Sequence, residues 1–170
     1  MKRVNLYNIL DIVMIYRFSL FITGESYIPI TCKELQDNPL HIYSDWTKDD
    51  TYRQRGKSYR YGYGGSHLLH DSIYAITEEE RAQIIGDILL FLERNAEILK
   101  RHEATDVELS ATVYLEKSER FLLLTKNEME QLSRCGNISI RLDILCLSKK
   151  EFIDIQTDMI KERNLINERL

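Results

Sequence analysis

Residues 124–147 read LTKNEMEQLSRCGNISIRLDILCL, and this stretch decides the fold class. Thr125 and Glu128 form an S/T-x-x-E capping box, in which the hydroxyl and the carboxylate bind backbone N–H groups at a helix start. The box predicts a helix over residues 126–134. Gly136 follows this segment and supplies the left-handed residue at which helices commonly stop.

The second half of the stretch, residues 137–147, alternates between apolar and polar side chains, as a β-strand does. Its apolar face holds Ile138, Ile140, Leu142, Ile144 and Cys146. Because this face is almost wholly apolar, we expect the strand at the centre of a sheet. We expect Cys146 there as a small buried hydrophobe. A capped helix followed by a strand indicates a protein of mixed α and β structure.

The capping signature occurs three more times, at Thr31–Glu34, Thr77–Glu80 and Ser148–Glu151. These boxes predict helices over 31–37, over 78–101 and from 149 towards the end of the chain. The first helix must be short, because a helix ends before a residue such as Pro39.

Alternating and β-rich segments fill the gaps between the helices. They predict strands over 16–23, 41–46, 68–76, 106–116 and 120–124, the last joined to its predecessor by a turn at Lys117-Ser118. The expected fold class is α+β, with a single largely antiparallel sheet packed by the helices at 78–101 and 126–134, plus a C-terminal helix. The domain would span 16–147, with an N-terminal extension over 1–15 and the C-terminal helix over 148–170.

The composition is that of an ordinary globular protein, with 170 residues, 44% hydrophobic and 29% charged residues and a net charge of −4. Three scattered cysteines do not form a disulfide framework. Asp11 and Arg17 interrupt the apolar N-terminal stretch, which argues against a secretory signal or a membrane span. We therefore expect a cytoplasmic protein. Met1 and Met14 both remain candidates for the natural start.

The sequence contains no motif of an enzyme, a cofactor site or a metal site. Gly62, Gly64 and Gly65 lack the spacing of a dinucleotide-binding loop. His67 and His70 are three residues apart in an extended segment, which places them on opposite faces. We therefore expect no catalysis, no cofactor and no metal, although an active site built from scattered residues stays open as an alternative.

Residues 48–65 are the unusual segment, with a net charge of +3 inside an acidic protein. Aromatic and basic side chains alternate here, and both are frequent at protein interfaces and at nucleic-acid sites. The predicted partner-binding residues are Tyr52, Arg53, Arg55, Lys57, Tyr59, Arg60, Tyr61 and Tyr63. Three glycines close the segment, so we expect an irregular loop that is the least ordered internal part of the chain. A simple solvated loop is the alternative to a binding site.

Residues 77–110 carry a net charge of −5. The simplest interpretation is the solvated face of an amphipathic helix. The functional interpretation is an acidic surface that steers a basic partner.

A resemblance adds to these patterns. Phe18-Ser-Leu-Phe-Ile-Thr-Gly24, followed by the capped Thr31-x-Lys-Glu-Leu35, resembles the opening of a bacterial family catalogued only as a domain of unknown function. Further similarity to the family lies in Arg55-Gly-Lys57, in Ile88-Leu-Leu-Phe-Leu92 and in the helix, turn and strand from Leu124 to Ile144 at the end of the similar region. The chain departs from the family in having Ile73-Tyr74 where members usually have a tryptophan; its one tryptophan is Trp46.

The resemblance covers about 16–147 and implies no enzyme activity. Some such small cytosolic domains are thought to act as immunity proteins, which neutralise a cognate toxin. We therefore expect a non-enzymatic, immunity or antitoxin-like protein whose partner is a toxin or effector protein. A nucleic-acid-associated regulator using 48–65 is the alternative, and no membrane partner is expected.

Overall fold

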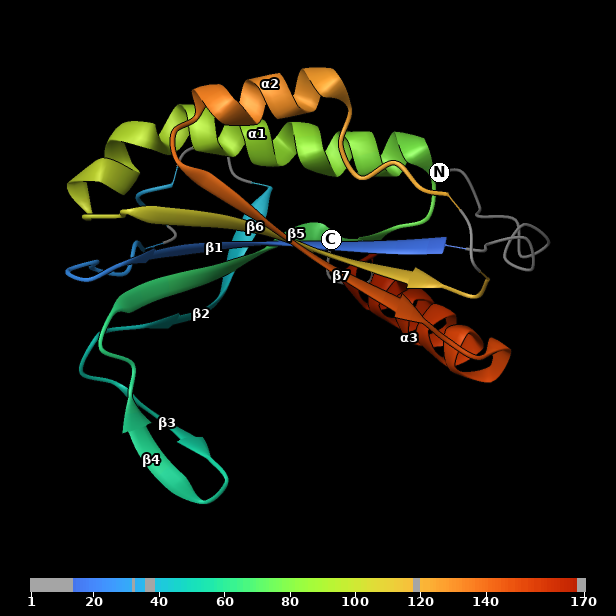
Figure 1. The fold of residues 1–170 in the computed structure, drawn as a ribbon, viewed down its shortest axis with the longest axis horizontal. Coiled ribbons are helices and arrows are strands. Elements are labelled where there is room, and N and C mark those ends of the chain that lie inside the picture. The colour runs from blue at the N-terminus through green and yellow to red at the C-terminus, as the bar shows by residue number, and fades with distance from the viewer. Residues whose placement is uncertain (1–13, 32, 36–38, 118–119, 168–170) are drawn as a thin grey trace.

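The computed structural model of the chain describes residues 14–31, 33–35, 39–117 and 120–167. Its main element is a five-stranded sheet (Figure 1). The strands are β1 (Met14–Gly24), β2 (Leu40–Trp46), β5 (Gly64–Ala75), β6 (Asp106–Leu115) and β7 (Ile138–Cys146). A separate two-stranded hairpin contains β3 (Thr51–Gln54) and β4 (Lys57–Arg60).

The strands of the large sheet lie in the order β2-β5-β1-β6-β7. Strand β1 is central and pairs antiparallel with both β5 and β6. Strand β2 pairs antiparallel with β5, whereas β7 runs parallel to β6. The expected α+β class with a largely antiparallel sheet is confirmed.

Helix α1 (Glu78–Arg101) packs on one face of the sheet, and α2 (Lys126–Arg134) packs against α1. Both helices have the predicted bounds, and Thr77 and Thr125 cap them as expected. Alternate side chains of β1 point at α1 and form the centre of the core with apolar residues of the helix. The largest of the fully buried side chains in this layer are Phe18, Leu20, Ile22, Leu68, Ile84, Ile85, Ile88, Phe91 and Leu109.

The opposite face of the sheet, here called the open face, is covered only at one end among the described residues. There α3 (Lys149–Asn167) packs Phe152 and Met159 against Ile15. Beyond this contact, β1 presents Arg17, Phe21 and other half-buried side chains on the open face. Figure 1 shows α3 on the other side of the sheet from α1.

The expected central position of the strand at 138–146 is wrong, because β7 is an edge strand. Its apolar side chains lie on the same face as α1, yet Leu142 is 40% exposed and Ile144 is 49% exposed. Helix α1 packs over β1, β2 and β5 and so leaves β7 uncovered. Cys146 is exposed as well, which corrects its expected burial.

Two other expected elements are not seen among the described residues. The described residues of 31–37 make a turn, although Thr31 and Glu34 still form the local hydrogen bonds of a capping box. The rest of that segment lies outside the described residues. Residues 120–124 form no strand; the carbonyl of Leu123 instead accepts a hydrogen bond from Arg81, near the start of α1.

A buried arginine explains the path of residues 120–124. The guanidinium of Arg81 is 2% exposed and donates hydrogen bonds to Glu78, to Glu128 and to the carbonyl of Leu123. Burial would lower the pKa of Arg81, but the hydrogen bonds to the two carboxylates outweigh it and raise that pKa. The chain at Leu123 is thus held by side-chain contacts and not by a strand ladder.

Within the described part of the chain, no helix is long and apolar enough to cross a membrane.

Candidate functional site

Residues 47–63 form a β-arm, defined here as the β3–β4 hairpin with its two connections to the sheet. The expectation of an irregular loop is wrong, because Tyr52 pairs with Tyr59 and Thr51 with Arg60 in a regular antiparallel ladder. In Figure 1 the β-arm extends away from the sheet and its helices. Every residue of β3 and β4 is exposed.

A two-residue turn closes the β-arm. Arg55 has a φ of 50° and Gly56 a φ of 78°, and two successive positive φ values define the type I′ turn, which suits the twist of a hairpin. At the base, the backbone N–H of Tyr61 donates to the carbonyl of Asp50, at 3.2 Å. The segment therefore has a specified shape, despite burying few side chains.

The ladder separates the tyrosines of the two strands from their arginines, whereas Lys57 lies on the same face as the tyrosines. Because successive side chains of a strand point to opposite faces, the register places Tyr52 and Tyr59 on one face and Arg53 and Arg60 on the other. Arg60 also lies 4.0 Å from the carboxylate of Asp49. The β-arm thus has a tyrosine face and an arginine face.

An aromatic row runs from the tyrosine face to the sheet. The ring centroids of Tyr52 and Tyr59 are 5.6 Å apart, those of Tyr52 and Tyr61 are 4.8 Å apart, and Tyr61 stacks on Trp46 at 5.3 Å. The indole of Trp46 occupies the space that a side chain at Gly65 would fill. The row is therefore anchored on β5 by a glycine.

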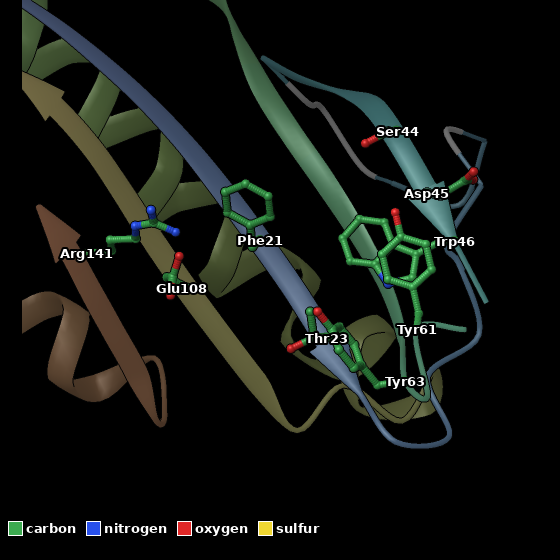
Figure 2. Close-up of a pocket in the computed structure, with 9 residues that line it drawn as sticks. All are labelled: Phe21, Thr23, Ser44, Asp45, Trp46, Tyr61, Tyr63, Glu108 and Arg141. Carbon is green, nitrogen blue, oxygen red and sulfur yellow. The ribbon is translucent and has the colours of Figure 1, made fainter. Parts of the chain in front are cut away.

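A cleft of about 580 Å³ lies between the base of the β-arm and the far strands of the sheet. Figure 2 shows Trp46 and Tyr61 on one side of it, Phe21 within it, and Glu108 and Arg141 on the other side. Its full lining is Phe21, Thr23, Ser44, Asp45, Trp46, Tyr61, Tyr63, Glu108 and Arg141. The cleft therefore combines an aromatic wall with a charged wall.

His67 lies on the open face beside this cleft. Its ring stacks on Phe21 with a centroid distance of 4.2 Å, and Tyr43 contacts it edge-on at 5.4 Å. Burial, and secondarily the nearby charge of Arg17, lower the pKa of His67, so the ring is neutral at pH 7. His70 points the other way and bonds Asp87 of α1 at 3.0 Å, which confirms that the two histidines occupy opposite faces.

Two ring nitrogens near the cleft are buried and lack a hydrogen-bond partner among the described residues. They are Nε1 of Trp46 and Nε2 of His67. Most buried polar atoms in proteins are paired, because an unpaired one costs about 1–3 kcal/mol. The hydrogen bonding of buried polar atoms is therefore less complete in this part of the open face than in the core on the other side of the sheet.

The structure places all eight sequence-predicted residues on or at the base of the β-arm. It brings Tyr52, Tyr59, Tyr61 and Tyr63 together in the aromatic row, and Lys57 shares the face of Tyr52 and Tyr59. Arg53 and Arg60 lie on the other face, and Arg55 lies in the turn.

The sequence interpretation missed the cleft residues outside the β-arm. Phe21 could have been recognised from the sequence, because it is a large apolar residue at an otherwise polar position of the alternating 16–23 strand. Trp46 carried no comparable signal, since its contact depends on the pairing of β2 with β5.

Side chains that commonly ligate metals are scattered over the described residues. No three His, Cys, Asp or Glu side chains within them lie close enough together to hold a metal ion.

Comparison of the chain with protein-family models, with curated proteins and with solved structures found no match.

Proposed function

We propose that the chain is a non-enzymatic protein-binding domain, and that its partner contacts the tyrosine face of the β-arm and the adjoining cleft. The observation that carries the proposal is the aromatic row, which extends from the exposed Tyr52–Tyr59 pair of the β-arm to Trp46. Tyrosine provides a large rigid contact area at low cost in conformational entropy, and for this reason it is common at interface hot spots.

The form of the β-arm supports this proposal. The type I′ turn and the antiparallel ladder fix its backbone before any partner arrives, so binding orders few additional residues. Tyr52 is 37% exposed and Tyr59 is 42% exposed even though their rings are stacked. Preformed aromatic rings that remain accessible are well suited to an interface.

The cleft supports a specific mode of contact. Its volume of about 580 Å³ is large enough for one or two side chains of a partner. Asp45 and Glu108 line it together with the faces of Trp46 and Tyr61, and the charge of Arg141, which also lines it, is paired with Asp143 at 3.2 Å. Carboxylates beside aromatic faces attract a cation, so an arginine or lysine of the partner is the occupant that we propose.

The finer hypothesis is that the chain is an immunity or antitoxin-like protein that neutralises a cognate toxin. It is supported by the net charge of −4, by the absence of catalytic motifs from the sequence and by the accessible aromatic contact surface. A nucleic-acid partner is favoured less. Phosphate binding needs several basic groups beside the stacking rings, whereas Arg53 and Arg60 lie on the face opposite the tyrosines and, of the basic residues in the ladder, only Lys57 shares the tyrosine face.

The proposal is tested by co-expressing the chain with the protein encoded beside it in the genome. We expect wild type to restore growth when that protein is toxic and to co-purify with it. The variant Tyr59→Ala/Tyr61→Ala should lose both effects while remaining folded by circular dichroism. If the double variant protects and co-purifies as wild type does, the aromatic row is not the contact surface.

A further inference from the structure

We propose that the chain forms a two-fold symmetric dimer in which the β7 strands of two copies pair antiparallel, with Leu142 on the symmetry axis. The result is a continuous ten-stranded sheet. This inference concerns the edge of the sheet and not the β-arm; the two proposals share one residue, Arg141, which also lines the cleft.

The first observation is that the β7 edge lacks the usual protection. Exposed edges normally carry a bulge, a proline, lysines or a covering segment, because their free backbone groups would otherwise pair with another chain. Strand β7 pairs with β6 over all nine residues without a register shift, and it contains neither proline nor lysine; its two charged residues, Arg141 and Asp143, have opposite signs and pair with each other. In the described part of the chain, no element covers its outer side.

The opposite edge of the sheet provides a contrast. Strand β2 has an irregularity between Ile42 and Ser44, which interrupts its pairing with β5. A bulge twists an edge and hinders its pairing with a second strand. Of the two edge strands of the sheet, β2 is therefore interrupted and only β7 is regular along its whole length.

The second observation is an exposed apolar row on β7. Ile140 is 38% exposed, Leu142 is 40% exposed and Ile144 is 49% exposed, and all three point to the face that carries α1. A row of this kind on a regular edge is costly in a monomer. A second strand beside β7 would cover it.

The third observation identifies the occupant as a second copy of this chain. With Leu142 on the axis, Arg141 of one copy lies opposite Asp143 of the other, and the same pair forms again across the axis. Ile140 then lies opposite Ile144, so that apolar residues meet apolar residues. Within one chain Arg141 and Asp143 form an ion pair at 3.2 Å, but their side chains are 61% and 46% exposed, so each can exchange this partner for the same residue of the second copy. The strand is therefore complementary to itself in both charge and hydrophobicity.

Sedimentation equilibrium tests the assembly, and the expected mass is twice the 20.1 kDa of the chain. Arg141→Asp should place four acidic groups around the axis, and Asp143→Arg should place four basic groups there. We expect each change to raise the dimer Kd at least about tenfold, because like charges directly opposite repel. Lys57→Asp, the same kind of charge reversal in the β-arm, should leave the Kd unchanged.

Mixing the two variants provides the decisive result. In a mixed pair, both acidic positions of the Arg141→Asp chain lie opposite basic positions of the Asp143→Arg chain. An equimolar mixture should therefore form a heterodimer although neither variant dimerises well alone. The double variant Arg141→Asp/Asp143→Arg should dimerise as wild type does. A wild-type chain that stays at 20.1 kDa up to millimolar concentration overturns the dimer, and variants that do not complement each other overturn the register.

Cross-linking tests the axis directly, in a background in which Cys32, Cys135 and Cys146 are replaced by serine. Leu142→Cys should form a disulfide between copies, because directly opposite residues of antiparallel strands have Cα atoms about 4.5–5.5 Å apart, within reach of a disulfide. Ser139→Cys is the control, since the two copies of residue 139 would be about 20 Å apart. Equal cross-linking of both variants contradicts the proposed axis.

Discussion

The indole of Trp46 lies directly against the Cα of Gly65, its register partner on the neighbouring strand. A methyl group at Gly65 would overlap the indole ring, so Gly65→Ala must displace Trp46 and the aromatic row attached to it. We expect this change to lower the free energy of unfolding by about 1–3 kcal/mol. The chain has one tryptophan, so its fluorescence reports on the same contact during urea unfolding.

Gly86 provides the matched control for this substitution. It lies within α1, and nothing lies within 4 Å of a Cβ built there. Gly86→Ala should therefore raise the free energy of unfolding by about 0.5–1 kcal/mol, because alanine favours a helix over glycine. If Gly65→Ala and Gly86→Ala changed the free energy of unfolding equally, the position of the Trp46 indole would not depend on the missing side chain at Gly65.

Arg81 links α1, α2 and residues 120–124, so its removal should be strongly destabilising. Arg81→Met leaves the carboxylate of Glu128 buried without its counter-ion, and we expect a loss of about 3–5 kcal/mol. Arg81→Met/Glu128→Gln should recover a large part of that loss, because no buried charge then remains. Urea midpoints of the two variants give this comparison, and equal losses would argue against the ion pair.

The pH dependence of stability should contain a contribution from Glu34. Hydrogen bonds from the hydroxyl and the backbone N–H of Thr31, with a further contribution from His102, lower the pKa of Glu34 to about 2. A carboxyl group whose pKa is lowered by folding stabilises the protein above its ordinary pKa of about 4.5, and this contribution is lost as the pH falls towards 2.

Glu34→Gln should therefore flatten the dependence of the urea midpoint on pH between about 4.5 and 2. Glu97→Gln, on the exposed surface of α1, serves as the control and should leave the slope as it is in wild type. A slope that is the same in all three proteins would mean that Thr31 and Glu34 do not interact in solution.

The two faces of the β-arm should differ in their effect on partner binding. Tyr59→Ala removes a ring from the aromatic row and should speed dissociation, at a cost of about 2 kcal/mol if the ring is central to the interface. Arg53→Ala changes the other face and should alter the dissociation rate little. Surface-binding kinetics with the cognate partner measure both; a stronger effect of Arg53→Ala would assign the contact to the arginine face.

The acidic surface of α1 should act on association only. Replacing Glu78, Glu79 and Glu80 together would not test this surface alone, because Glu78 binds Arg81 and Glu80 binds the backbone N–H of Ile76. Glu79→Gln/Glu97→Gln avoids these contacts. It should slow association at low salt and have no effect at high salt, since exposed charges are screened there.

Local signals in the sequence predicted the helices well, because each depends on residues close together. Thr125 and Glu128 form both hydrogen bonds of a capping box, and the helix that they cap has the expected bounds. Gly136 has a φ of 113°, in the left-handed region expected after a helix. The capping box at Thr31 shows that such a signal does not always predict a helix. Its side-chain hydrogen bonds form, but the described residues around it make a turn.

The errors concern relationships between distant segments. Alternation in 138–146 indicated a strand correctly but carried no information on how many neighbours that strand has. The alternating tyrosines and arginines suggested one mixed surface, whereas the type I′ turn at Arg55 and Gly56 creates a ladder that separates them. Of the cleft, only Tyr61 and Tyr63 were predicted, since the cleft joins these residues to others from β1, β2, β6 and β7.

The central position of β1 also has a consequence for the nascent chain during translation. Its neighbour β5 is complete at Ala75, but its other neighbour, β6, is complete only at Leu115. Synthesis of the 40 residues between them takes about 2–8 seconds at common translation rates. Throughout that interval one side of an apolar strand has no native neighbour. Residues 14–24 of the emerging polypeptide therefore expose a free strand edge for several seconds, which a ribosome-associated chaperone would shield.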